Sequence, residues 1–203
     1  SGYTGTDTVT YKITDGAVTV TGTAKIRVFN NAPTASAITQ TKKWSEIPTT
    51  GLVIPVLGTS SVSDADGDSL TLTYSGVPSG MSVSVSGNNL VFKPSQGFVG
   101  PASFDYSVSD GLASATARVT VTVQNNAPTA TTNTFTRHWR TRTGALNLAS
   151  YFSDVDLDTV VFTAVSQGIN GGATSFTGLV VTYTQANNYV GTDKFTVSYT
   201  DTW

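Results

Sequence analysis

Short runs of alternating apolar and polar residues, separated by Gly, Pro, Asn and Asp, make up most of this chain. Residues 103–109 show the pattern best, because Phe104, Tyr106 and Val108 alternate with polar residues. A period of two predicts β-strands with one face buried and the other in solvent. No segment carries the 3.6-residue period of an amphipathic helix, so the pattern predicts an all-β fold.

The same segments recur along the chain at a nearly fixed spacing. A strand of this type precedes Asp15, Asp110 and Asp201, and the linker Asn-Asn-Ala-Pro occurs at residues 30–33 and again at 125–128. A fixed period of about 95 residues is typical of an array of similar domains. Because Pro interrupts strands, we place the domain boundaries at the linkers. We expect strands F and G of a preceding repeat (1–30), a complete repeat (31–124) and a further repeat lacking its last strand (125–203).

The complete repeat contains enough short strands for a two-sheet sandwich. Good hairpin turns occur at Gly87-Asn88 and at Asp110-Gly111. Seven strands in about 95 residues are typical of an immunoglobulin-like Greek-key sandwich. The expected strands, A to G in order, are 35–41, 51–57, 69–74, 81–85, 89–93, 103–109 and 113–123.

The composition narrows the classes of function. Thr, Ser, Val and Gly dominate, Glu46 is the only glutamate, and there is no cysteine for a disulfide or a thiolate metal site. The net charge of −2 argues against a dedicated nucleic-acid-binding protein. No apolar run approaches the length of a membrane span, so we expect none in this segment. No nucleophile-elbow motif or paired catalytic carboxylates stand outside the repeats, so we do not expect an enzyme.

Half of the aspartates lie in two short acidic stretches. Residues 63–68 read Ser-Asp-Ala-Asp-Gly-Asp, and residues 153–158 read Ser-Asp-Val-Asp-Leu-Asp. Like charges packed this closely repel unless a cation binds them, and oxygen ligands select a hard cation, Ca²⁺ before Mg²⁺. The spacing does not match an EF-hand, because its sixth and twelfth positions are Ser69 and Ser75. The alternative interpretation is that these aspartates only form polar turns.

The order of motifs resembles a known family. Asn-x-Ala-Pro, Asp-x-Asp-Gly-Asp-x-Leu, Gly-Phe-x-Gly and Phe-x-Tyr-x-Val-x-Asp-Gly are similar to the bacterial cadherin-like tandem repeats of large surface adhesins. The stretch from Tyr151 to Asp158 also resembles the dystroglycan-type variant of these repeats. The resemblance covers essentially the whole chain and implies extracellular repeats that are stiffened by calcium at their joints.

Strand order in such a sandwich predicts which residues meet at each joint. The linker, the B–C loop and the F–G loop share the end at which the chain enters a repeat, and the E–F and A–B loops lie at the other end. The first joint then combines the linker and B–C loop with Asp7, in the E–F loop of the preceding repeat. At the second joint Glu46, in the A–B loop, replaces a residue like Asp7. The candidate ligands are Asp7, Asn30, Asn31, Asp64, Asp66 and Asp68 at the first joint, and Glu46, Asn125, Asn126, Asp154, Asp156 and Asp158 at the second.

The linkers carry amides where cadherins carry more acids, so we expect weak affinity for calcium, roughly 10⁻⁴ to 10⁻³ M. We interpret Asp110 and Asp201 as residues of Asp-Gly-type turns. Trp44 and Trp139 follow basic residues at equivalent positions, so they could stack on a sugar ring, and we favour packing within the sandwich.

Three functions fit these patterns. The first is a structural and adhesive stalk segment of a bacterial cell-surface protein, in which each repeat contacts its neighbours. The second is a subunit of a surface filament or sheath that associates head to tail by strand complementation. The third and weakest is a carbohydrate-binding module that recognises a surface glycan through its tryptophans.

Overall fold

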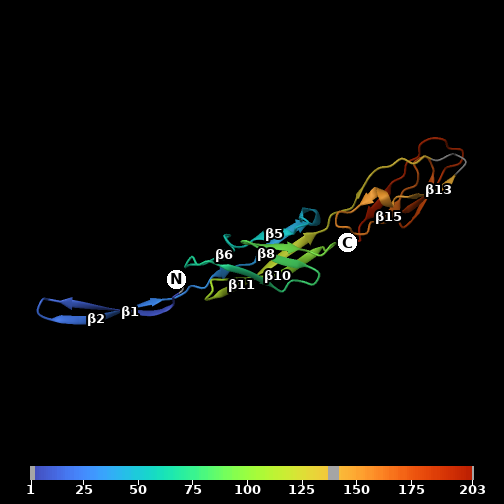
Figure 1. The fold of residues 1–203 in the computed structure, drawn as a ribbon. Coiled ribbons are helices and arrows are strands. Elements are labelled where there is room, and N and C mark those ends of the chain that lie inside the picture. The colour runs from blue at the N-terminus through green and yellow to red at the C-terminus, as the bar shows by residue number, and fades with distance from the viewer. Residues whose placement is uncertain (1–2, 137–141, 203) are drawn as a thin grey trace. The chain divides into compact units, whose positions relative to one another are not determined.

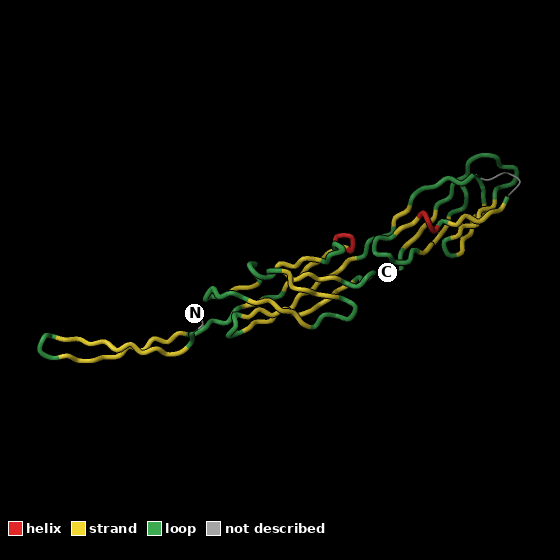
Figure 2. Tube along the Cα trace, in the orientation of Figure 1, coloured by secondary structure: helices red, strands yellow, loops and turns green. Residues whose placement is uncertain are grey.

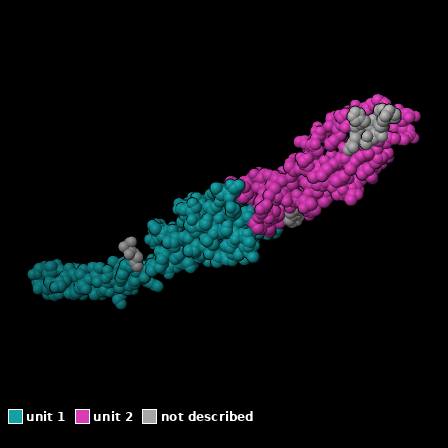
Figure 3. All heavy atoms as spheres, turned by 45° about the vertical axis from the view of Figure 1, so that its right-hand side comes forward, with its two compact units in different colours: residues 1–40, 49–94, 101–121 teal, residues 41–48, 95–100, 122–203 magenta. Residues whose placement is uncertain are grey.

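The computed structural model describes residues 3–136 and 142–202. Strands predominate in these residues, with two short 3₁₀ helices, η1 (Trp44–Glu46) and η2 (Ala149–Tyr151) (Figure 2). The chain separates into two compact units, residues 1–40, 49–94 and 101–121, and residues 41–48, 95–100 and 122–203 (Figure 3). The predominance of strands confirms the prediction of an all-β fold. None of the helices in the described part of the chain is long and apolar enough to span a membrane.

The first thirty residues form a two-stranded hairpin of β1 (Gly5–Thr14) and β2 (Thr19–Val28) (Figure 1). The pairing runs from Gly5 opposite Val28 to Thr14 opposite Thr19. The Asp15 carboxylate closes the turn by accepting hydrogen bonds from the N–H groups of Ala17 and Val18, at 2.9 and 2.8 Å. Its two strands lie where strands F and G were expected, and their assignment to a preceding repeat stays a prediction.

The complete repeat is a sandwich of two sheets. One sheet has the order β4 (Ile38–Lys43), β11 (Ser114–Gln124), β10 (Gly100–Ser109) and β7 (Thr71–Ser75). The other has the order β5 (Leu52–Pro55), β9 (Asn89–Lys93) and β8 (Ser82–Ser86). Two short strands, β3 (Thr34–Ala35) and β6 (Val62–Ser63), pair beside the linker. The seven main strands correspond to the expected strands A to G.

The core of this sandwich comes from the inward positions of the alternating runs. Phe104, Tyr106 and Val108 on β10 are all at most 1% exposed. The Phe92 and Phe104 rings stack with their centroids 5.7 Å apart. The buried Tyr106 hydroxyl donates a 2.7 Å hydrogen bond to the Ser36 carbonyl, which satisfies its polar atom in an apolar core.

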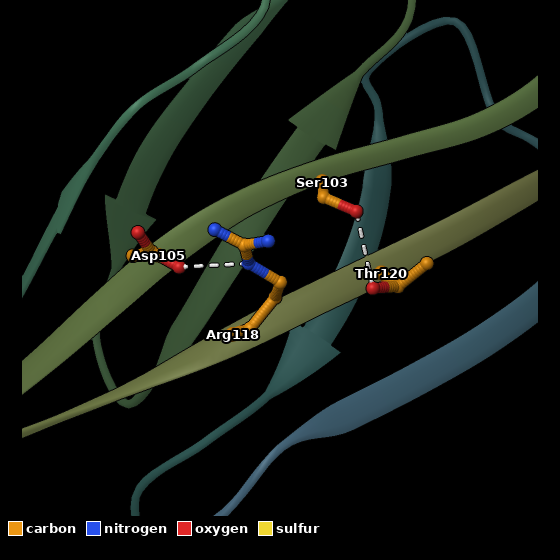
Figure 4. A network of polar contacts seen from close by, with 4 residues as sticks. All are labelled: Ser103, Asp105, Arg118 and Thr120. Atoms are coloured by element: carbon orange, nitrogen blue, oxygen red, sulfur yellow. Dashed lines mark hydrogen bonds and ion pairs between the residues drawn. The ribbon is translucent and has the colours of Figure 1, made fainter.

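The outward positions of the same strands carry polar side chains. Figure 4 shows Arg118 on β11 donating through Nε to Asp105 on β10 at 3.1 Å. Further along the same strands, the hydroxyls of Ser103 and Thr120 lie 3.1 Å apart. The alternation thus separates an apolar core from a face of paired polar groups, as expected for a half-buried sheet.

The described residues from 125 to 202 form a second sandwich. One sheet has the order β13 (Thr143–Asn147), β17 (Val180–Thr184) and β16 (Ala173–Thr177). A second pairs β15 (Val161–Val165) with β18 (Val197–Thr200), and β12 (Thr129–Ala130) pairs with β14 (Phe152–Ser153). Leu146, Leu148, Phe162 and Val181 form the buried core.

Candidate metal centre

The two acidic stretches each bring three carboxylates together. In each group, Asp64-Asp66-Asp68 and Asp154-Asp156-Asp158, one carboxylate oxygen per residue lies within 4.8 Å of the others. Each loop bends back on itself because the first aspartate accepts a hydrogen bond from the N–H of the second, at 2.9 Å from Asp66 and 2.7 Å from Asp156. The loops also need a positive φ at their fifth residue, which is +74° at Gly67 and +67° at Leu157. Because leucine rarely adopts this conformation, the second loop contains local backbone strain.

The linker asparagines hold the central aspartate of each group. The N–H of Asn31 donates to Asp66 at 2.7 Å, and the N–H of Asn126 donates to Asp156 at the same distance. The two side chains differ: the Asn31 amide donates to the other oxygen of Asp66 at 2.6 Å, whereas the Asn126 amide donates to the Ser45 hydroxyl at 2.9 Å. The second group therefore keeps a carboxylate oxygen on Asp156 that no linker amide satisfies.

Burial distinguishes the two groups further. Asp66 and Asp68 are exposed, but Asp156 is fully buried. Among the described residues, the buried oxygens without a hydrogen-bond partner are concentrated at the second group: Asn125 Oδ1, Asp154 Oδ2, Asp156 Oδ1 and Asp158 Oδ2, against Asp64 Oδ2 alone at the first. Buried polar atoms are normally satisfied, so these four oxygens make the second group unusually rich in unpaired acceptors.

The pKa values of the central aspartates also differ between the two groups: the pKa of Asp66 is lowered and the pKa of Asp156 is raised. Hydrogen bonds from the backbone and side chain of Asn31 lower the pKa of Asp66. Burial raises the pKa of Asp156, despite its bond from Asn126, and the charges of Asp154 and Asp158 raise it further. Burial and neighbouring charges likewise raise the pKa of Asp158. Asp156 and Asp158 therefore resist ionisation unless a positive charge compensates them.

Loops from the complete repeat lie against the second group within the same compact unit. The N–H of Ser45 donates to Asn126 Oδ1 at 3.1 Å. A Cβ atom on Gly97 would lie 3.7 Å from the Asp156 carbonyl oxygen and 3.8 Å from Asp158 Oδ1. The Gly97 turn therefore lies against the acidic loop, and Ser45 lies against the linker that holds it.

Two predicted ligands do not join these groups. Asp7 was expected in a loop, but it lies inside β1 opposite Ile26, where its carboxylate accepts a 2.9 Å bond from the N–H of Thr8. The strand includes Asp7 because the antiparallel pairing with β2 already begins at Gly5, before the alternating residues. Glu46 instead accepts a 2.8 Å bond from the N–H of Lys43 and closes η1. Neither residue belongs to the three-carboxylate groups found among the described residues.

The aspartate that corresponds to Asp7 in the last repeat has a local role. Asp193 accepts hydrogen bonds from the N–H groups of Asn170 and Gly172, at 2.8 and 3.1 Å, and from the Tyr183 hydroxyl at 2.9 Å. It therefore fixes the loop between β15 and β16 of its own repeat. This contact favours a structural role for the aspartate at this position.

The sequence analysis missed two residues that meet the linkers. Asp110 Oδ2 accepts a 2.8 Å bond from Asn30 Nδ2, and Asp201 Oδ2 accepts a 2.8 Å bond from Asn125 Nδ2. Asp110 does close a turn, as predicted, through its other oxygen. The available signal was the recurrence of aspartate directly after strand F in every repeat.

The tryptophan interpretation is not decided by these contacts. Trp44 is partly buried and begins η1. The Trp44 carbonyl accepts a 3.0 Å hydrogen bond from the N–H of Ile47. Trp139 lies outside the described residues. Packing and sugar binding both stay predictions, as does head-to-tail self-association.

Two immunoglobulin-like sandwiches in series, with an acidic loop beside each linker, define a class of tandem β-sandwich repeat protein. Residues 30–122 and 125–203 both match the family described as bacterial Ig domain. The chain therefore belongs to the bacterial Ig domain family.

Solved structures that are similar to this chain include an endo-fucoidan hydrolase from glycoside hydrolase family 107 (18% identity, 100% of this chain and 33% of that chain, TM-score 0.37). They also include the ectodomain of human desmocollin-1 (12% identity, 92% and 37%, TM-score 0.38) and the extracellular domain of protocadherin γB4 (14% identity, 95% and 37%, TM-score 0.40). The chain thus spans about a third of the length of each. A search of curated proteins found no match.

Proposed function

We propose that this chain is a structural and adhesive segment of a bacterial cell-surface protein, in which tandem immunoglobulin-like repeats are joined by calcium-binding loops. Membership of the bacterial Ig domain family supports the tandem structural role. The repeats bury ordinary apolar cores and offer paired polar faces, which suits a spacer that must stay soluble and folded.

The observation that carries the calcium assignment is the set of unsatisfied buried oxygens at the second group. Calcium takes six to eight oxygen ligands from carboxylates, amide carbonyls and water in a flexible geometry. The donor set here contains only oxygen, with no His or Cys, so it fits a hard cation and does not fit zinc. The residues that would hold the ion at the second group are Asn125, Asp154, Asp156 and Asp158; those at the first are Asp64, Asp66 and Asp68.

A bound calcium ion supplies positive charge that offsets the repulsion among the aspartates. The linker asparagines already hold the central aspartates, so an occupied loop and its linker form one rigid element. At the second group, the contacts of Ser45 and Gly97 extend that element to the loops of the complete repeat. Calcium binding would therefore stiffen the joint between consecutive repeats.

Titration calorimetry with calcium tests this proposal. The unmodified chain binds calcium, with a Kd of roughly 10⁻⁴ to 10⁻³ M for an extracellular module of this charge. Asp154→Asn with Asp156→Asn removes binding at the second group, whereas the matched pair Asp64→Asn with Asp66→Asn leaves it intact. The absence of calcium-dependent heat up to tens of millimolar would falsify the calcium assignment.

A further inference from the structure

The same side-chain pair occurs at both linkers. The NH₂ group of Asn125 donates to Asp201 at 2.8 Å, and the NH₂ group of Asn30 donates to Asp110 at 2.8 Å. The partners are 76 and 80 residues apart in the sequence, so the pair depends on the fold and not on a local turn. Asp201 is itself only 7% exposed.

A held amide presents its carbonyl oxygen in a definite direction. An asparagine side chain carries two N–H donors and one carbonyl acceptor, on opposite branches of the amide. With its NH₂ group bonded to Asp201, Asn125 keeps Oδ1 on the other branch, and this oxygen is buried without a hydrogen-bond partner. The other buried unsatisfied oxygens of this part of the chain belong to Asp154, Asp156 and Asp158.

An aspartate at position 125 could not be held in this way. A carboxylate has no donor at neutral pH, and it would repel the Asp201 carboxylate at the same separation. The contact therefore gives a physical reason for an amide in the linker: one side chain both donates to Asp201 and accepts toward a cation.

We propose that Asp201 is a positioning residue for cation binding, acting through the amide of Asn125. Asp201 fixes the Asn125 side chain so that its carbonyl oxygen is desolvated and oriented before the cation arrives. This inference rests on the calcium site proposed above.

A double-mutant cycle on calcium affinity tests the inference. It uses a parent chain in which Asp64→Asn with Asp66→Asn removes calcium binding at the first group, so that only the second group is titrated. Loss of a residue that orients a metal ligand typically weakens affinity about 10- to 100-fold. We expect Asp201→Ala to weaken calcium binding about tenfold, and Asp201→Asn, which retains an acceptor, to stay within about threefold of the parent. In an Asn125→Ala background, Asp201→Ala should change affinity less than about twofold, because the residue through which it acts is gone.

The outcomes distinguish a positioning role of Asp201 from a role as a direct ligand or as a charge. An equal loss from Asp201→Ala with and without Asn125 overturns the inference, since Asp201 would then act independently as a ligand or a charge. An unchanged affinity in Asp201→Ala overturns it as well. Asp105→Ala, which removes an exposed carboxylate from the other sandwich, is the charge-matched control and leaves affinity unchanged. If the parent chain with Asp64→Asn and Asp66→Asn binds no calcium, the calcium site proposed above is wrong, and so is the positioning role of Asp201.

A metal-free readout accompanies the titrations. In EDTA, the side-chain NH₂ protons of Asn125 should exchange slowly and show a hydrogen-bonded chemical shift in NMR spectra of the parent. Asp201→Ala should return both to the values of a solvated amide, and thermal unfolding in EDTA verifies that the variant remains folded. Identical Asn125 NH₂ signals in the two proteins contradict the contact.

Discussion

Replacing Asp156 by Asn should stabilise the metal-free protein, although Asp156 is a central residue of the proposed site. The Asp156 side chain is fully buried, and its Oδ1 atom has no hydrogen-bond partner. An uncompensated buried carboxylate costs free energy, which is why its pKa is raised by burial and by nearby charges. Asparagine keeps an acceptor for the N–H of Asn126 and adds two donors beside the unsatisfied oxygens of Asp154 and Asp158.

The expected magnitude comes from one new hydrogen bond to a charged group. Such bonds contribute about 1.5–3 kcal/mol, so we expect a gain of about 1.5 kcal/mol in the free energy of unfolding in EDTA. For a domain of this size, each 1 kcal/mol raises Tm by roughly 4–8 °C.

Calcium should reverse the order of stability. At a calcium concentration about 100 times Kd, binding to the folded state adds about 2.7 kcal/mol to the parent. Asp156→Asn loses this increment at the second group, because it removes the central carboxylate. The parent should therefore be at least as stable as the variant in calcium, and less stable in EDTA.

Scanning calorimetry of the full chain, with and without calcium, measures both states. Asp105→Asn is the control, because its exposed ion pair with Arg118 contributes less than about 1 kcal/mol in either condition. A lower Tm of Asp156→Asn in EDTA refutes the reasoning, since the buried charge would then be satisfied within the protein itself.

Three further predictions concern single contacts in the two sandwiches. Although burial opposes it, hydrogen bonds from Asn170, Tyr183 and other groups lower the pKa of Asp193 below 3.8, so its ionised form stabilises the fold above that pH and this contribution is lost as the pH falls through the lowered pKa. Asp193→Asn should thus destabilise by about 1–3 kcal/mol at pH 7, and this loss should shrink as the pH falls through the lowered pKa, measured by urea unfolding. A Cβ atom on Gly168 would clash with the Asp193 carboxylate, so Gly168→Ala should cost about 1–3 kcal/mol in the parent and much less in an Asp193→Ala background, where the clashing carboxylate is gone. Tyr106→Phe should cost about 1–2 kcal/mol in thermal unfolding, because it removes the 2.7 Å hydrogen bond from the buried Tyr106 side chain to the Ser36 carbonyl.

The fold could be predicted from the sequence because alternation is local. Side chains two apart in a strand share a face, so the placing of Phe104, Tyr106 and Val108 in the core needed no knowledge of other strands. In β1, the same reasoning predicts an inward face of Val9 and Ile13, yet these are 48% and 60% exposed. A pattern identifies the face that could be buried, but burial itself needs a second sheet to cover it.

The candidate site could be predicted only where its residues are neighbours in the sequence. The acidic triplets are local, and the structure brings each one together. The bonds from Asn125 to Asp201 and from Asn30 to Asp110 join residues far apart, and their geometry depends on the packing of strand F against the linker. Asp7 and Glu46 were placed by strand order alone, and each has a nearer backbone partner that strand order does not reveal.

The central claim is that calcium stiffens the joint between consecutive repeats. Small-angle X-ray scattering of the unmodified chain, in calcium and then in excess EDTA, tests it most directly. Calcium should increase the maximum dimension and reduce the flexibility seen in the scattering profile, and EDTA should reverse both. Asp154→Asn with Asp156→Asn should give the EDTA profile even in calcium. Profiles that superimpose with and without calcium contradict the claim, and the aspartate triplets would then be turns that hold no ion.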